Sequence, residues 1–221
     1  MTQAVWSLVW SSTLQTLIMV LFSTIFSLAL GFPLGVLLCV TRPELQGGIM
    51  PKPLLNTFLD KVVNVLRSFP FIILMVVLFP LSRVIVGTTI GTKATIVPLS
   101  IAAAPFVARV IESSLKEVDS GVVQAARSMG STNSQIIFKV LIPEALPSLV
   151  SGVTLTIINI IGYSAMAGAI GGGGLGDLAI RYGYQRSRTD VLIAAVLVIL
   201  VLVELIQFIG NKISAAIAAS R

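Results

Sequence analysis

The chain has 221 residues, of which 56% are hydrophobic and 11% charged, and its mean hydropathy is +1.00. Soluble domains carry roughly a quarter charged residues, so this composition excludes an ordinary soluble domain, and the net charge of +6 marks cytoplasmic membrane edges rather than a surface for nucleic acid. The lack of histidine and the single cysteine, Cys39, exclude a histidine-based active site, an internal disulfide and a cysteine-rich metal site.

Five apolar segments are long enough to be membrane spans in contact with lipid, because a spanning helix needs about 20 mainly apolar residues. They cover residues 13–40, 62–82, 95–111, 144–170 and 190–210. The stretches between them are polar or rich in glycine and proline, as expected of loops. The sequence therefore predicts an all-α polytopic membrane protein with about five transmembrane helices, folded as a single transmembrane domain over residues 1–221.

The distribution of basic residues predicts the orientation of these spans. If the N-terminus lies outside, the inner loops and tail hold Arg42, Lys52, Lys61, Lys116, Arg127, Lys139, Lys212 and Arg221. The outer loops then hold Arg83, Lys93, Arg181, Arg186 and Arg188. Lysine and arginine are enriched in cytoplasmic loops, so the N-terminus is expected outside and the C-terminus in the cytoplasm. Arg67 and Arg109 fall at inner helix ends, where long basic side chains extend toward the headgroups.

The longest charged interruption is the interval 112–143, between the third and fourth spans. Asp119 or Ser120 can cap a short helix over about residues 121–129. Gly130 can end that helix in a left-handed conformation, which glycine adopts without steric cost. The interval is therefore predicted to contain a short helix outside the membrane.

Small residues give this short helix a surface that another protein could approach. Ala125 and Ala126 would present a face without bulk to the groove of a partner, and Pro143 sits where a new helix could begin. The alternative is an ordinary amphipathic loop that lies against its own bundle.

The same interval resembles the EAA loop of ABC-importer permeases. Gln124-Ala125-Ala126, Gly130 and Val140-Leu141-Ile142-Pro143 have the spacing of that loop, which reads Glu-Ala-Ala, a glycine and then Ile-x-Leu-Pro. In that family the loop docks into a separate ATP-hydrolysing subunit. The resemblance implies that coupling to an ATPase uses Gln124, Ala125, Ala126, Arg127, Gly130 and Pro143. Gln124 departs from the glutamate usual in the family, which removes one charge near the start of the helix.

Further segments resemble the methionine-uptake branch of this family. They are residues 67–74, 83–88, 103–109, 143–147 and 162–166. The resemblance implies a type I ABC importer permease in the bacterial inner membrane. It also implies a homodimer, two ATP-binding subunits that hold ATP and Mg²⁺, and an extracytoplasmic methionine-binding lipoprotein, with no cofactor in this chain. The alternatives are an ABC permease for another amino acid or small solute, and a self-sufficient secondary transporter.

Polar residues within the spans are candidates for the substrate path, because such groups usually face the interior of a helix bundle. The fourth span contains Asn159, Tyr163 and Ser164, with Met166 as a candidate apolar constriction. The second span contains an unusually polar entry, from which Ser68, Phe69 and Pro70 are assigned to the path. The alternative is that these side chains only form hydrogen bonds to neighbouring helices.

A glycine-rich stretch matches the dinucleotide fingerprint at Gly171, Gly173 and Gly176. A functional fingerprint follows a strand in a βαβ unit, and that unit is missing here. The glycines are therefore expected to form a re-entrant or tightly turned segment instead.

Overall fold

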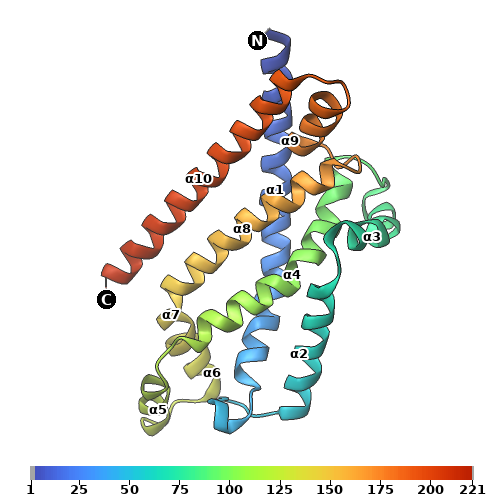
Figure 1. Cartoon of the computed structure of the whole chain (residues 1–221). Coiled ribbons are helices and arrows are strands. Elements are labelled where there is room, and N and C mark those ends of the chain that lie inside the picture. Colours follow the sequence, from blue (N-terminus) through green and yellow to red (C-terminus); the bar gives the residue numbers. More distant parts are fainter. Residues whose placement is uncertain (1–2, 221) are drawn as a thin grey trace.

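The computed structural model describes residues 3–220, and all regular elements in that range are helices (Figure 1). Four helices are long and apolar enough to cross a membrane, and a bent pair of helices makes a fifth crossing if it is counted as one span. Leucine, isoleucine and phenylalanine side chains lie exposed along several of them, as expected for helices that face lipid. The predicted all-α membrane fold is confirmed.

Helix α1 (Gln3–Val40) runs the length of the molecule and packs against α4 (Thr92–Lys116). Glycines allow the two backbones to approach closely. A Cβ atom added to Gly31 would lie 2.6 Å from the carbonyl oxygen of Ala104, and one added to Gly35 would lie 2.5 Å from that of Ala108. Small residues at such crossings are typical of membrane helices, because van der Waals packing drives their association.

The second predicted span, residues 62–82, is not a single helix. The chain instead forms α2 (Pro53–Ser68) and α3 (Phe71–Val86), which meet at an angle of 103°. Phe69 and Pro70 between them have extended backbones, with ψ of 133° and 127°. Proline lacks an N–H group and disfavours the helical conformation of the residue before it, which explains a break at this point.

The fourth and fifth spans are confirmed as α8 (Leu146–Gly168) and α10 (Thr189–Ala219). Between them, α9 (Gly174–Asp177) and the π-helix η3 (Leu178–Tyr184) lie near the N-terminal end of α1 (Figure 1).

The glycine-rich stretch is a tightly turned segment held on α1. The N–H of Gly174 donates to Oε1 of Gln15 over 2.9 Å, and the N–H of Leu175 donates to Oγ1 of Thr16 over the same distance. Gly173 and Gly174 have positive φ angles, which glycine adopts readily. The expectation of a tight turn is confirmed.

The opposite end of the bundle carries the short elements of the predicted docking loop (Figure 1). The loop contains α5 (Ser120–Ser128), α6 (Asn133–Gln135), the π-helix η2 (Ile136–Leu141) and α7 (Ile142–Glu144). The 3₁₀ helix η1 (Glu44–Gln46) follows α1 at the same end. Helix α1 begins at the end that carries α9, and α10 ends away from it at the side of the molecule (Figure 1).

Candidate functional site

Local sequence chemistry fixes both ends of α5. The Oδ1 atom of Asp119 accepts a hydrogen bond of 2.6 Å from the N–H of Gly121, so Asp119 is the N-cap. Gly130 has a φ of 77° and its N–H donates to the carbonyl oxygen of Arg127 over 2.9 Å. The predicted cap and the predicted left-handed glycine are both confirmed.

The two alanines of α5 face different directions. Ala125 is exposed, whereas Ala126 is only 3% exposed and packs in an apolar cluster with Leu115, Ile136 and Leu141. Successive residues of a helix are about 100° apart, so two neighbours cannot share one narrow contact face. The expectation that both alanines present a surface to a partner is wrong for Ala126, because this residue attaches α5 to its own bundle.

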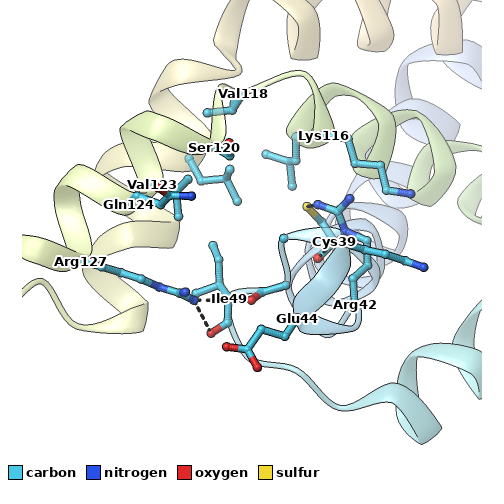
Figure 2. Close-up of a pocket in the computed structure, with 15 residues that line it drawn as sticks. Cys39, Arg42, Glu44, Ile49, Lys116, Val118, Ser120, Val123, Gln124 and Arg127 are labelled. Carbon is cyan, nitrogen blue, oxygen red and sulfur yellow. Dashed lines mark hydrogen bonds between the residues drawn. The ribbon is translucent and has the colours of Figure 1, made fainter.

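Arg127 also attaches α5 to the rest of the chain. Its Nη2 atom donates to the carbonyl oxygen of Ile49 over 3.0 Å and to that of Gly48 over 3.5 Å (Figure 2). A cavity of about 320 Å³ lies beside this contact, and Arg42 and Gln124 are among its lining residues. Arg127 therefore positions the docking helix against the segment that follows α1.

Pro143 is the second residue of α7, which continues directly from η2, so its missing N–H donates no hydrogen bond back into η2. Before it, η2 buries Ile136, Ile137 and Leu141. The short helix α5 and the return to the membrane at Pro143 are thus joined by a buried apolar segment. The structure brings the predicted coupling residues together at one end of the molecule, where Gln124, Ala125 and Gly130 are exposed.

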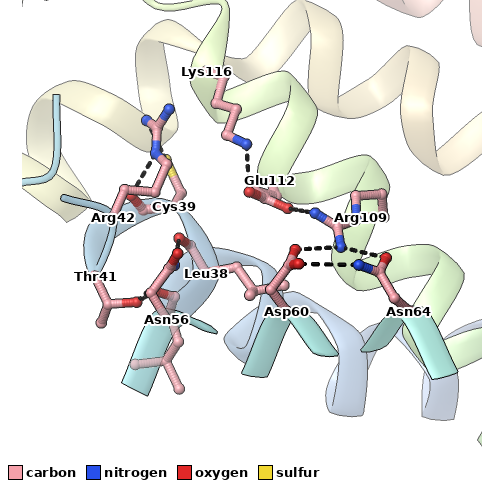
Figure 3. Close-up of polar contacts among 11 residues, drawn as sticks. Leu38, Cys39, Thr41, Arg42, Asn56, Asp60, Asn64, Arg109, Glu112 and Lys116 are labelled. Atoms are coloured by element: carbon pink, nitrogen blue, oxygen red, sulfur yellow. Dashed lines mark hydrogen bonds and ion pairs between the residues drawn. The ribbon is translucent and has the colours of Figure 1, made fainter. Parts of the chain in front are cut away.

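A charged network joins α2 to α4 close to this end (Figure 3). Arg109 forms ion pairs with Asp60 over 2.7 Å and with Glu112 over 2.6 Å, and Lys116 pairs with Glu112 over 2.5 Å. Asn64 accepts a further hydrogen bond of 2.8 Å from Arg109. The expectation that Arg109 extends to the headgroups is wrong, because two acids and an amide hold its guanidinium inside the bundle.

The break between α2 and α3 brings part of the predicted substrate path together. Asn159, Tyr163 and Phe69 line a pocket of about 160 Å³. The ring of Tyr163 stacks on that of Phe71, with 4.3 Å between centroids and 6° between planes. Arg67, which the sequence analysis assigns to the headgroup region, lines the same pocket. Its place beside this pocket follows from the division of the second span into α2 and α3.

Other predicted path residues lie elsewhere. Ser68 and Pro70 line a neighbouring, more open groove together with Asn64. Ser164 is buried and its hydroxyl donates to the carbonyl oxygen of Ile161 over 2.8 Å, which matches the alternative of a purely local hydrogen bond. Met166 is 47% exposed and lies outside the pocket.

A polar stripe on α2 is a feature that the sequence reasoning missed. Thr57, Lys61, Asn64 and Ser68 are all exposed and recur at intervals of four, three and four residues, so they share one face of the helix. Residues 41–61 read as a loop because they contain prolines and charges, yet α2 begins at Pro53. The helical spacing of the polar residues was the available signal.

The family model described as "Binding-protein-dependent transport system inner membrane component" matches residues 31–218. The probable D-methionine transport system permease protein MetI of Vibrio cholerae is 53% identical over 82% of this chain and 79% of its own length. The protein with the same description in Pasteurella multocida is 47% identical over 97% of both chains.

Among solved structures, a chain of the MetNI methionine ABC transporter in an inward-facing conformation superposes with a TM-score of 0.95. It is 46% identical, and the match covers 98% of this chain and 99% of that one. Both the family model and these relatives cover far more than half of the sequence. The chain therefore belongs to the family of binding-protein-dependent transport system inner membrane components, and it is a transport subunit rather than an enzyme.

Proposed function

We propose that this chain is the permease subunit of an ATP-driven importer for methionine, in its D- and L-forms. The observation that carries the proposal is the likeness, over nearly the whole chain, to proteins described as methionine permeases. The chain would act as a homodimer with two ATP-binding subunits, and an extracytoplasmic methionine-binding lipoprotein would deliver the substrate. ATP and Mg²⁺ would bind to the ATPase subunits, and this chain would hold no cofactor.

The polar stripe of α2 supports a path between two copies of the chain. A polar side chain at membrane depth is costly unless it faces protein or a water-filled cavity. The stripe is exposed in the single chain and runs along a helix that pairs with α3 to form one crossing. A second copy facing the stripe would enclose it, and the enclosed space would be the wet path for the substrate.

The candidate path residues extend from this stripe. Ser68, Phe69 and Pro70 lie at the break, and Asn159 and Tyr163 face it from α8. Met166 is on the same side of α8 as Asn159 and Tyr163, since the three positions are spaced by four and three residues. Its exposed thioether side chain would supply an apolar constriction along the path.

Coupling to ATP hydrolysis would pass through α5. Gln124 and Ala125 of the predicted docking motif are exposed, and Ala126 and Arg127 hold α5 on the bundle. Helix α4 carries the motion onward, because Leu115 at its end packs with Ala126 while Arg109 holds Asp60 of α2. ATP would favour one of two global states by binding its ATPase arrangement more tightly.

The location we infer is the bacterial inner membrane, with the N-terminus outside and α5 in the cytoplasm. The end of the molecule with α5 carries Arg42, Lys52, Lys116, Arg127 and Lys139. This orientation agrees with the enrichment of basic residues on the cytoplasmic side.

Reconstitution tests the proposal. The chain is co-expressed with a candidate ATPase, purified in detergent and inserted into vesicles, and uptake of labelled L- and D-methionine is measured with and without internal ATP and binding protein. We expect uptake only when both are present. ATP-independent uptake by the chain alone would overturn the proposal in favour of a secondary transporter, and ATP-dependent uptake of a different solute would overturn the substrate.

A further inference from the structure

We propose that the pocket at the break between α2 and α3 is a binding site for one zwitterionic amino acid, with Arg67 as the partner of its carboxylate. This break pocket is lined by Arg67, Phe71, Phe106, Asn159 and Tyr163, among others. The inference rests on the proposed function for the choice of an amino acid. The inference goes beyond the proposed function because it gives the permease itself a defined binding site and names the residue that would bind the carboxylate of the amino acid.

Three polar side chains of the break pocket have unused hydrogen-bonding capacity. Within the described part of the chain, the side chains of Arg67, Asn159 and Tyr163 make no hydrogen bond or ion pair. Arg109, by contrast, is matched by two acids and an amide. Arg67 is exposed in the single chain, and Asn159 and Tyr163 are half-buried, so the polar atoms of all three are open to water or to a polar ligand.

The chemistry of the three groups matches an amino-acid backbone. A guanidinium binds a carboxylate through two parallel N–H donors, which makes Arg67 the natural contact for the substrate's carboxylate. Asn159 offers an amide oxygen that can accept from an ammonium group. The face of the Tyr163 ring can also attract the ammonium group. Both charges of a zwitterion therefore find partners within one pocket.

The remaining lining is apolar and aromatic. Phe71 stacks on Tyr163, and Phe106 of α4 and Leu74 of α3 complete the wall. Thioether sulfur makes favourable contacts with aromatic rings, so a methionine side chain suits this wall. The volume of about 160 Å³ is below the roughly 300–1,000 Å³ of sites for drug-sized ligands. A single small amino acid fits this size class.

The pocket draws its walls from four helices, so its shape depends on how they are arranged. Arg67 lies in the last turn of α2, Phe71 begins α3, Phe106 belongs to α4, and Asn159 and Tyr163 belong to α8. A change of the angle at the break would move Arg67 relative to Asn159. A site of this kind binds its ligand differently in two global states, as alternating access requires.

Cysteine protection can locate binding within this pocket. Ala102 lines it, and Cys39, the single native cysteine, is buried elsewhere, beside Arg42. The test protein carries Cys39→Ala and Ala102→Cys and is purified as the complex with its ATPase, without nucleotide or binding protein. Its labelling by a small methanethiosulfonate reagent is followed as L-methionine is titrated. Ser113→Cys, exposed on the same helix, serves as the labelling control.

We expect methionine to slow labelling at position 102 but not at position 113. Methioninamide, which lacks the carboxylate charge, is expected to give no protection at the same concentration. Arg67→Gln should raise the half-protecting concentration of methionine by about tenfold to a hundredfold, the range expected for a lost charge-assisted hydrogen bond. The half-protecting concentration for Arg67→Lys should lie between those of the wild type and Arg67→Gln, because lysine keeps the positive charge but lacks the two parallel N–H donors of the guanidinium. Arg83→Gln, an exposed arginine outside the pocket, should leave protection unchanged.

Equal protection by methionine and methioninamide would overturn the site. Unchanged protection in both Arg67 variants, in protein that still assembles with the ATPase, would overturn it as well. A lack of any protection at saturating methionine, in a protein that performs ATP-dependent uptake, would also overturn it while leaving the proposed function intact. Failure of the proposed function has a different signature, since the same cysteine protein would then show no ATP-dependent methionine uptake.

Discussion

The different directions of Ala125 and Ala126 give a matched test of the docking helix. Ala125→Arg adds a long charged side chain to an exposed position, whereas Ala126→Arg adds it to a position that is 3% exposed. Both residues lie inside α5, and arginine is a good helix former, so helix propensity changes equally in the two variants. Any difference between them comes from what each side chain contacts.

The structure predicts different magnitudes for the two variants. A surface substitution away from special features usually changes stability by less than about 0.5 kcal/mol, so Ala125→Arg should leave the fold intact. At position 126 the new side chain must displace Leu115, Ile136 or Leu141, or carry its charge into their apolar cluster. Overpacking of a core costs about 1–3 kcal/mol, and an unpaired buried charge adds several more. Ala126→Arg should therefore detach α5 from the bundle.

Two measurements separate these effects in the detergent-solubilised protein. Limited proteolysis of the 117–135 segment and thermal unfolding report on the attachment of α5, and ATP-dependent methionine uptake reports on coupling. We expect Ala125→Arg to be protease-resistant with uptake reduced at least tenfold, and Ala126→Arg to be cleaved rapidly and inactive. Normal uptake by Ala125→Arg would refute the assignment of the docking face, and wild-type protease resistance in Ala126→Arg would refute its buried role.

Two further variants test the packing of the bundle. Glu112→Gln removes the acid shared by Arg109 and Lys116 and should destabilise the protein by about 1–3 kcal/mol. The control is Lys116→Met, which removes the more exposed partner and should cost less than about 1 kcal/mol. Equal melting temperatures of the two variants would contradict a structural role for the buried acid. Gly35→Val should lower the melting temperature by several degrees, because its Cβ would lie 2.5 Å from the carbonyl oxygen of Ala108. The control Gly162→Ala has open space around its Cβ and should leave the melting temperature unchanged or slightly raised. A lower melting temperature for Gly162→Ala than for Gly35→Val would contradict the α1–α4 contact.

Features that depend on local chemistry were predictable from the sequence. The Asp119 cap, the left-handed Gly130 and the long apolar helices each follow from a few neighbouring residues, and each is confirmed. The pairing within α4 of Arg109 with Glu112 at i,i+3 had a local signal as well. The contact of Arg109 with Asp60 did not, since the two residues are 49 positions apart and meet only through the packing of α2 on α4.

The break at Phe69 and Pro70 was missed for a different reason. A hydropathy pattern measures whether a segment is apolar, and residues 62–82 are apolar on both sides of the proline. A proline can bend, end or start a helix in a membrane, and the sequence alone does not decide among these. The 103° angle results from where α3 packs, which is against α4 and α8. This error also misplaced Arg67, because its assignment to the membrane edge assumed a span that begins beside it.

The break and the charged network together explain how a small motion of α5 could reach the substrate path. Among the described residues, Asp60–Arg109 is the ion pair that joins two different membrane helices, and it holds α2 to the same helix on which α5 packs. Helix α3 lacks this ion pair and contacts α4 through packing instead, and the extended residues at the break separate α3 from α2. A displacement of α4 would therefore act on α2 through the ion pair and on α3 through packing, and unequal movement of the two helices would change the angle that shapes the break pocket. Arg109→Met should then reduce ATP-dependent uptake by more than it reduces assembly with the ATPase, because docking at α5 remains while its connection to α2 is lost. Equal loss of uptake and assembly would mean that Arg109 only stabilises the fold and does not connect α5 to the substrate path.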